Sequence, residues 1–249
     1  MSRSALVSRL TARAAVASRA GAAGRTRITV LRSDGPIALR ETPLGVYLVG
    51  TAAGPLGGDD LALDIDVGPG SSLVIRSAAG MLLLPGPHGG ASALRISARV
   101  GPGGRLDFAP QPAVAADGCL HQAAARIHLA AGAALRWREE IVLGRHAEPS
   151  GRCVSRLDVT LDGAPAYRGE LNVGHPPTDH SGAVLDDAGA VGSVLLVDAA
   201  RARPPAAVHD GLAVLPLAVP GAAVTATARD AVILARRLDL GEERAGYLG

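Results

Sequence analysis

The sequence has 249 residues and no lysine, and all 25 of its basic residues are arginine. The phosphate-binding loop of ATP- and GTP-hydrolysing enzymes ends in a lysine followed by serine or threonine, so this motif is excluded. With 23 acidic residues the net charge is only +2. Because this balance creates no strong field, we expect neither nucleic acid nor a membrane among the partners.

Aromatic residues are also scarce: they make up 2% of the chain, against 48% hydrophobic residues overall. The core must therefore be built from Ala, Val, Leu and Ile. Each of these side chains buries less apolar surface than an aromatic ring, at roughly 25 cal/mol per Å². A partner could supply the burial that the chain lacks.

Cys119 and Cys153 are the only cysteines. Two are too few for a secreted disulfide scaffold or a cysteine-rich zinc site, so we expect a reducing cytoplasm. No apolar run approaches the ~18 residues that a membrane span needs. Residues 1–24 are rich in Ala, Ser and Arg without the apolar block of a secretory signal. We expect them to form a flexible N-terminal extension, followed by a single β domain over 25–249.

The segment Gly54-Pro55-Leu56-Gly57-Gly58-Asp59-Asp60 predicts a tight turn that leads into a strand. From Leu61 to Val67 apolar residues alternate with acids, which predicts one buried face and one acidic face.

A strand–glycine turn–strand unit then repeats about every 30 residues, with its turn glycine at Gly70, Gly103 and Gly132. Such repeats stack, so we expect a mostly β fold of many short strands, either a layered β-sandwich or an irregular β-superhelix. One or two helices are expected. The clearest lies around 228–238, with Thr227 as its N-terminal cap.

Candidate chemistry is sparse. His175, Asp179 and His180 have the spacing of a weak metal site, although a solvated turn explains them better. Cys119 and His121 share a strand face and could hold a soft metal transiently, but a small buried Cys beside an ordinary His is the simpler interpretation. No nucleophile elbow, catalytic triad or dinucleotide fingerprint is present.

The remaining candidates are carboxylates at strand edges and turns. Glu139 falls on the apolar face of its strand, which places it at an edge or buried against a partner such as Arg145. A row of carboxylates along a water-filled passage would bind a divalent cation weakly, since oxygen ligands hold nickel loosely.

Several ordered pieces resemble the family of the urease accessory protein UreD, also called UreH. They are the Gly54–Asp59 turn, the Val-Gly-Pro-Gly-Ser turn, the segment Leu106–Pro112, Gln122, the strand Gly132–Glu139, and Leu143-Gly144-Arg145. The sequence departs from the family pattern at Ile75–Met81 and at His146–Gly151, and its C-terminal part is shorter.

This resemblance implies a non-enzymatic urease maturation scaffold that binds apo-urease and recruits UreF and the GTPase UreG. It also implies a passage for nickel, bound only transiently, and no tightly bound cofactor. The matching segments give Asp59, Asp60, Glu140 and Glu148 as passage candidates, and Gly57, Gly58, Gly144 and Arg145 as structural positions.

Two other hypotheses stay open on the residues alone. One is a general β-sandwich binding module without a role in metal delivery. The other is a metal-dependent hydrolase built on His175, Asp179 and His180.

Overall fold

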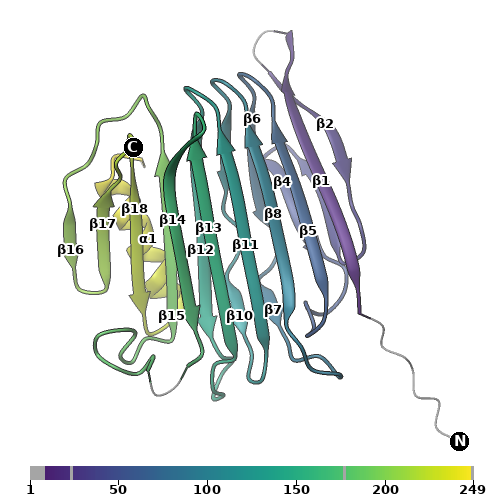
Figure 1. Ribbon diagram of the computed structural model, residues 1–249, viewed down its shortest axis with the longest axis vertical. Coiled ribbons are helices and arrows are strands. Elements are labelled where there is room, and N and C mark those ends of the chain that lie inside the picture. Colours follow the sequence, from purple (N-terminus) through teal and green to yellow (C-terminus); the bar gives the residue numbers. More distant parts are fainter. Residues whose placement is uncertain (1–8, 23–24, 176–177, 248–249) are drawn as a thin grey trace, which may run out of the picture.

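Two β-sheets lie face to face in the computed structural model, which describes residues 9–22, 25–175 and 178–247 (Figure 1). The seven-stranded sheet has the order β14 (Ala164–Val173), β13 (Arg152–Leu161), β11 (Leu120–Leu129), β8 (Ser92–Val100), β5 (Asp60–Val67), β1 (Thr11–Ala20), β2 (Thr26–Arg32). The main path of the eleven-stranded sheet is β16 (Ala207–His209), β17 (Leu212–Pro216), β18 (Gly221–Ala228), β15 (Ala190–Val197), β12 (Ala134–Leu143), β9 (Arg105–Phe108), β6 (Ser72–Ser77), β4 (Gly45–Gly50), β3 (Ile37–Thr42). Beside this path, β10 (Ala113–Ala115) pairs with β12 and with β7 (Met81–Leu83).

The chain winds between the two sheets as a β-superhelix. Strands β1, β5, β8, β11 and β13 are parallel neighbours in one sheet, and β4, β6, β9 and β12 are parallel neighbours in the other. The turn glycines Gly70, Gly103 and Gly132 have φ of 62°, 62° and 70°, a left-handed conformation that favours glycine. Consecutive turns also stack, since the Gly70 amide donates to the Pro102 carbonyl at 3.0 Å. The prediction of stacked strand–turn–strand repeats is confirmed.

Antiparallel strands and one helix complete the fold at the C-terminal end. Strands β15, β18, β17 and β16 extend the larger sheet beyond β12, and helix α1 (Ala231–Arg244) packs on β15, β17 and β18. The predicted helix near the C-terminus is confirmed, but it spans Ala231–Arg244 rather than 228–238, and the predicted cap Thr227 was wrong. Thr227 lies inside β18, paired with Val191, and the cap is Asp230, whose carboxylate accepts from the Ile233 amide at 2.8 Å.

The expected flexible extension is wrong for residues 11–20, which form β1. This strand pairs in register with β5 and buries Ala12, Ala14 and Val16 in the space between the sheets. Its arginines point outward to the acids of β5: Arg13 Nε lies 2.7 Å from Asp64, and Arg19 Nη2 lies 2.6 Å from Asp66. Residues 1–8 of the expected extension lie outside the described residues.

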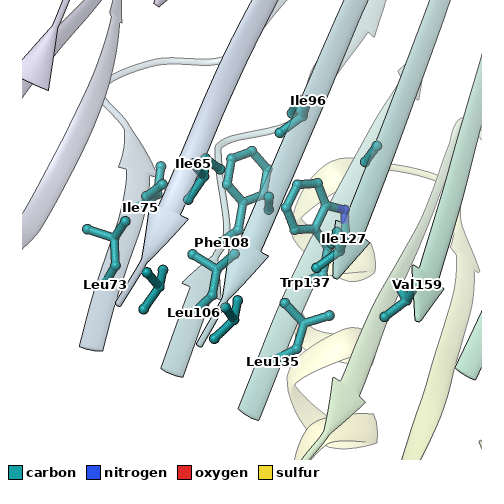
Figure 2. Close-up of a cluster of buried hydrophobic side chains, with 14 of the residues drawn as sticks. Ile65, Leu73, Ile75, Ile96, Leu106, Phe108, Ile127, Leu135, Trp137 and Val159 are labelled. Atoms are coloured by element: carbon teal, nitrogen blue, oxygen red, sulfur yellow. The ribbon is translucent and has the colours of Figure 1, made fainter. Parts of the chain in front are cut away.

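The largest core cluster fills the space between the two sheets (Figure 2). Phe108 of β9 and Trp137 of β12 stack at its centre with ring centroids 4.0 Å apart and an interplanar angle of 11°. Aliphatic side chains from both sheets, such as Ile96 and Leu106, surround the pair. In the described part of the chain, no helix has the length and apolar character that crossing a membrane requires.

If β1 is part of the core, a polar group placed on its inner face should be costly. We expect Val16→Asn to lower the free energy of unfolding by about 3 kcal/mol, because a buried amide would have no hydrogen-bond partner. The same change at the outward neighbour, Ala15→Asn, should cost less than about 1 kcal/mol. Urea denaturation of both variants measures this, and equal stabilities would show that β1 does not belong to the core.

Candidate functional site

A cavity of about 340 Å³ lies between the two sheets, next to the Phe108–Trp137 stack. Its wall is mostly apolar, with Leu63 and Ile96 from the smaller sheet and Ile141 from the larger one. Exposed loop residues, among them Ala53 and Ala79, also line it, so the cavity reaches the surface of the molecule. The polar and sulfur-bearing side chains in its wall are Asp59, Ser77, Met81, Gln111, His121, Glu139, Glu140, Cys153 and Ser155.

Glu139 is held in this wall by two hydrogen bonds. The Trp137 indole Nε1 donates to one carboxylate oxygen at 2.8 Å, and the Ser155 hydroxyl donates to the other at 2.8 Å. Burial raises the pKa of this carboxyl, and the two hydrogen bonds oppose that effect. The expected partner Arg145 was wrong: its guanidinium is paired with Glu148 instead.

His121 and Cys153 lie side by side in the same wall. They are registered neighbours on β11 and β13, and both are buried. The Ser92 hydroxyl lies 2.8 Å from His121 Nδ1. Burial lowers the pKa of His121 to about 4 and raises that of the Cys153 thiol to about 12. At neutral pH the histidine is therefore uncharged, and the cysteine is a thiol rather than an activated nucleophile.

Asp59 lies at the edge of the cavity, at the end of the Gly-Gly turn. Its carboxylate accepts from the Leu10 amide at 3.1 Å and from the Leu56 amide at 2.9 Å, which fixes the turn and ties it to the chain just before β1. Gly58 has φ of 99°, and a Cβ on Gly57 would lie 2.7 Å from the backbone of Gly86. Only glycine fits these two positions without a shift of the backbone.

Glu140 belongs to the cavity wall, but its carboxylate is paired on the helix side of the sheet. Arg138 Nε lies 2.7 Å from Glu140, and Arg138 Nη1 lies 2.5 Å from Asp239 of α1. Arg136 Nε makes a further ion pair with Glu242 at 2.6 Å. These contacts fasten α1 to β12 and leave the second oxygen of Glu140 without a hydrogen-bond partner among the described residues.

Asp60 and Glu148 do not line the cavity. Asp60 is paired with Arg95 on the outer face of the smaller sheet. Glu148 lies 2.7 Å from Arg145 Nε and also accepts from the Arg145 amide at 2.8 Å, and the guanidinium holds its pKa down at about 2. The Gly144 amide donates to the Ala115 carbonyl at 3.0 Å, so Gly144 and Arg145 form a corner after β12.

The histidine loop forms a turn. Asp179 accepts from the amides of Gly174 and His175 at 2.6 and 2.8 Å, and His175 Nε2 lies 2.7 Å from the Asn172 side-chain oxygen. His180 is exposed. Over residues 9–22, 25–175 and 178–247, no three His, Cys, Asp or Glu side chains converge as metal ligands. The geometry therefore does not support the hydrolase hypothesis.

The sequence analysis named Asp59, Glu140 and Glu139 singly, but it did not bring Glu139, His121 and Cys153 together in one wall. The signal for Glu139 was its place on the apolar side of β12. His121 and Cys153 occupy registered positions on β11 and β13, but no local sequence pattern shows that these two strands are neighbours. His121 and Cys153 become neighbours only because β11 pairs with β13, which is a contact between segments that are far apart in the sequence.

The fold and the cavity define a two-sheet β-superhelix that encloses a partly polar space. A family profile described as UreD urease accessory protein matches residues 10–245. The urease accessory protein UreD of Parafrankia sp. (strain EAN1pec) is 43% identical in an alignment 256 residues long, gaps included, that covers 92% of this chain and 86% of that protein. The protein of the same name from Streptomyces coelicolor is 38% identical over 238 residues, with 92% and 94% covered. The chain belongs to the UreD family of urease accessory proteins, as its motifs indicated.

The environment of Glu139 predicts a pH-dependent stability. A carboxyl with a raised pKa in the folded state costs stability at pH values above its ordinary pKa of 4.5, and the cost grows until the pH passes the raised value. Glu139→Gln removes this cost and keeps an acceptor for Trp137. We therefore expect this variant to be more stable than the wild type at pH 7, and the difference to fade as the pH falls to about 4.

Thermal unfolding between pH 4 and pH 7.5 measures this difference. His121 is present in both proteins, so its own titration cancels. Glu140→Gln is the matched control: it is the adjacent residue on the opposite face, and its loss of charge removes a partner of Arg138, so it should be destabilising. A Glu139→Gln variant less stable than the wild type at pH 7 would contradict this account.

Proposed function

We propose that this chain is a non-catalytic scaffold for urease maturation, which binds apo-urease, recruits UreF and UreG, and provides a passage for nickel through its inter-sheet cavity. Family membership over residues 10–245 supports the maturation role. The setting we propose is the cytoplasm, with no tightly bound cofactor. Burial raises the pKa of the Cys153 thiol and keeps it protonated at neutral pH, which supports a non-catalytic role.

The observation that carries the passage is the charge of the cavity wall. Two carboxylates border it, that of Asp59 at the edge and that of Glu139 inside, while the carboxylate of Glu140 is paired on the helix side of the sheet; no arginine lines the cavity among the residues that the structure describes. A wall with negative and without positive groups attracts a cation. Because most of the wall is apolar and the carboxylates are already hydrogen-bonded or paired, the attraction stays weak enough for release.

The structure changes which residues belong in this proposal. Asp59 and Glu140 remain, as residues at the wall, and Glu139 joins them as the carboxylate that faces the interior. Asp60 and Glu148 are left out, because each is paired with an arginine away from the cavity. The cargo ion is a substrate of the passage, so no resident metal is required.

The maturation role is tested in cells that carry a complete urease gene cluster. Deletion of this gene should abolish or strongly lower urease activity, because apo-urease would remain without nickel. Apo-urease purified from the deletion strain should regain activity when incubated with excess nickel and bicarbonate, which shows that the enzyme itself is intact. Unchanged activity after deletion would leave a binding module without a role in metal delivery as the better explanation.

The passage is tested by filling the cavity. Ala123 lies on the inner face of β11 between Leu94 and Ser155, and it lines the cavity. We expect Ala123→Phe to occupy this space and to lower urease activity several-fold in the same cells, while the amount of this protein stays near that of the wild type.

Gln122→Phe is the matched control, because Gln122 is the other neighbour of Ala123, is exposed on the outer face of the sheet and does not line the cavity. This variant should support normal urease activity. Full activity with Ala123→Phe, in a protein shown to be folded and present, would mean that nickel does not pass through the cavity.

A further inference from the structure

We propose that Cys153 and His121 together form a two-donor metal position in the cavity wall, where a borderline divalent cation such as Ni²⁺ or Co²⁺ is held by one sulfur and one imidazole nitrogen. This inference rests on the proposed function only in that the ion has to enter the cavity.

The register of the strands brings the two donors together. His121 of β11 and Cys153 of β13 are directly opposite each other on parallel neighbouring strands. Such strands lie about 4.8 Å apart, and side chains at registered positions point to the same face. Both residues are almost fully buried, at 3% and 2% exposure, and both line the cavity. Their side chains are therefore adjacent and directed into the same space.

Ser92 orients the imidazole. It is opposite His121 on the other neighbouring strand, β8, and its hydroxyl lies 2.8 Å from Nδ1. Metal-binding histidines have this arrangement: one ring nitrogen is fixed by a polar partner, and the other binds the ion. Here Nε2 is the nitrogen left for the ion.

The thiol makes the position selective, and the small number of protein donors keeps it weak. A sulfur donor with an imidazole favours borderline and soft cations over Mg²⁺ and Ca²⁺, which prefer oxygen ligands. When the ion binds, the S–H bond of Cys153 breaks, the sulfur keeps the electron pair as thiolate, and the proton leaves to the solvent. No group of three metal-binding side chains converges in the described residues, so solvent would complete the coordination sphere. Two protein donors suit an ion that stops briefly and moves on.

The full-length protein, titrated with cobalt(II) chloride alone, provides the test. Thiolate bound to Co²⁺ gives a charge-transfer band in the near ultraviolet, and we expect this band to appear and to saturate. Cys153→Ser should abolish it, and His121→Asn should weaken cobalt binding at least several-fold. Cys119→Ser is the matched control: Cys119 is the other buried cysteine, on the chain just before β11, and its loss should leave the band unchanged.

Thermal unfolding of each variant without metal shows whether it is folded, and magnesium chloride should produce no change in the wild type. Absence of the band in folded wild type, or its survival in Cys153→Ser, would overturn the proposal. These outcomes are separate from the urease experiment. Loss of urease activity on gene deletion, with no cobalt band, would rule out this metal position and keep the maturation role. A cobalt band with unchanged urease activity would keep the metal position and rule out the maturation role.

Discussion

The structure depends on how closely the backbone turns of successive layers approach one another. A Cβ on Gly101 would lie 2.8 Å from the Pro69 nitrogen, and one on Gly104 would lie 2.9 Å from the Gly101 carbonyl oxygen. Those contacts leave no room for a side chain, so glycine at these turns is what allows strands about 30 residues apart to become registered parallel neighbours. The register in turn decides which side chains meet between the sheets, including His121 with Cys153. The site is therefore a consequence of the repeat.

The second determinant is the supply of side chains that must fill the space between the sheets. Where Phe108 and Trp137 stack, together with Leu106 and Ile96, the space is packed. Next to them the wall carries small residues such as Ala113, Ala123 and Ala125, which leave the cavity open. A chain with only 2% aromatic residues lacks the volume to fill both regions. The scarcity of aromatic residues therefore has a local effect: the space between the sheets is packed around Phe108 and Trp137 and open in the adjacent cavity.

Alternation along strands was readable from the sequence, but the partners of each strand were not. The acidic face of β5 was expected, whereas the arginines of β1 lie in a segment that was expected to be a flexible extension. They are in fact the partners of those acids: Arg13 and Arg19 reach Asp64 and Asp66 from the next strand. The same alternation explains why Asp60 and Glu140, both predicted as passage residues, direct their carboxylates away from the cavity. Adjacent residues along an extended chain point to opposite faces. In each of the pairs Asp59–Asp60 and Glu139–Glu140, only one carboxylate can therefore point toward the cavity. The cavity itself could not be foreseen, because it depends on packing between distant segments.

The distribution of charge follows from this alternation and bears directly on function. On β12, Arg136 and Arg138 face α1 and are occupied by Glu242, Glu140 and Asp239, while Glu139 faces the interior and is satisfied by neutral donors. If an arginine reached Glu139, its fixed positive charge would repel a cation; with no hydrogen bonds at all, the buried carboxyl would retain a proton and lose its attraction. The donors from Trp137 and Ser155 carry no positive charge, and their hydrogen bonds oppose the rise in the pKa of Glu139 that burial causes. One strand therefore separates the arginines that hold the helix in place from the carboxyl group of Glu139, which faces the interior, and the proposed passage for a cation depends on this separation.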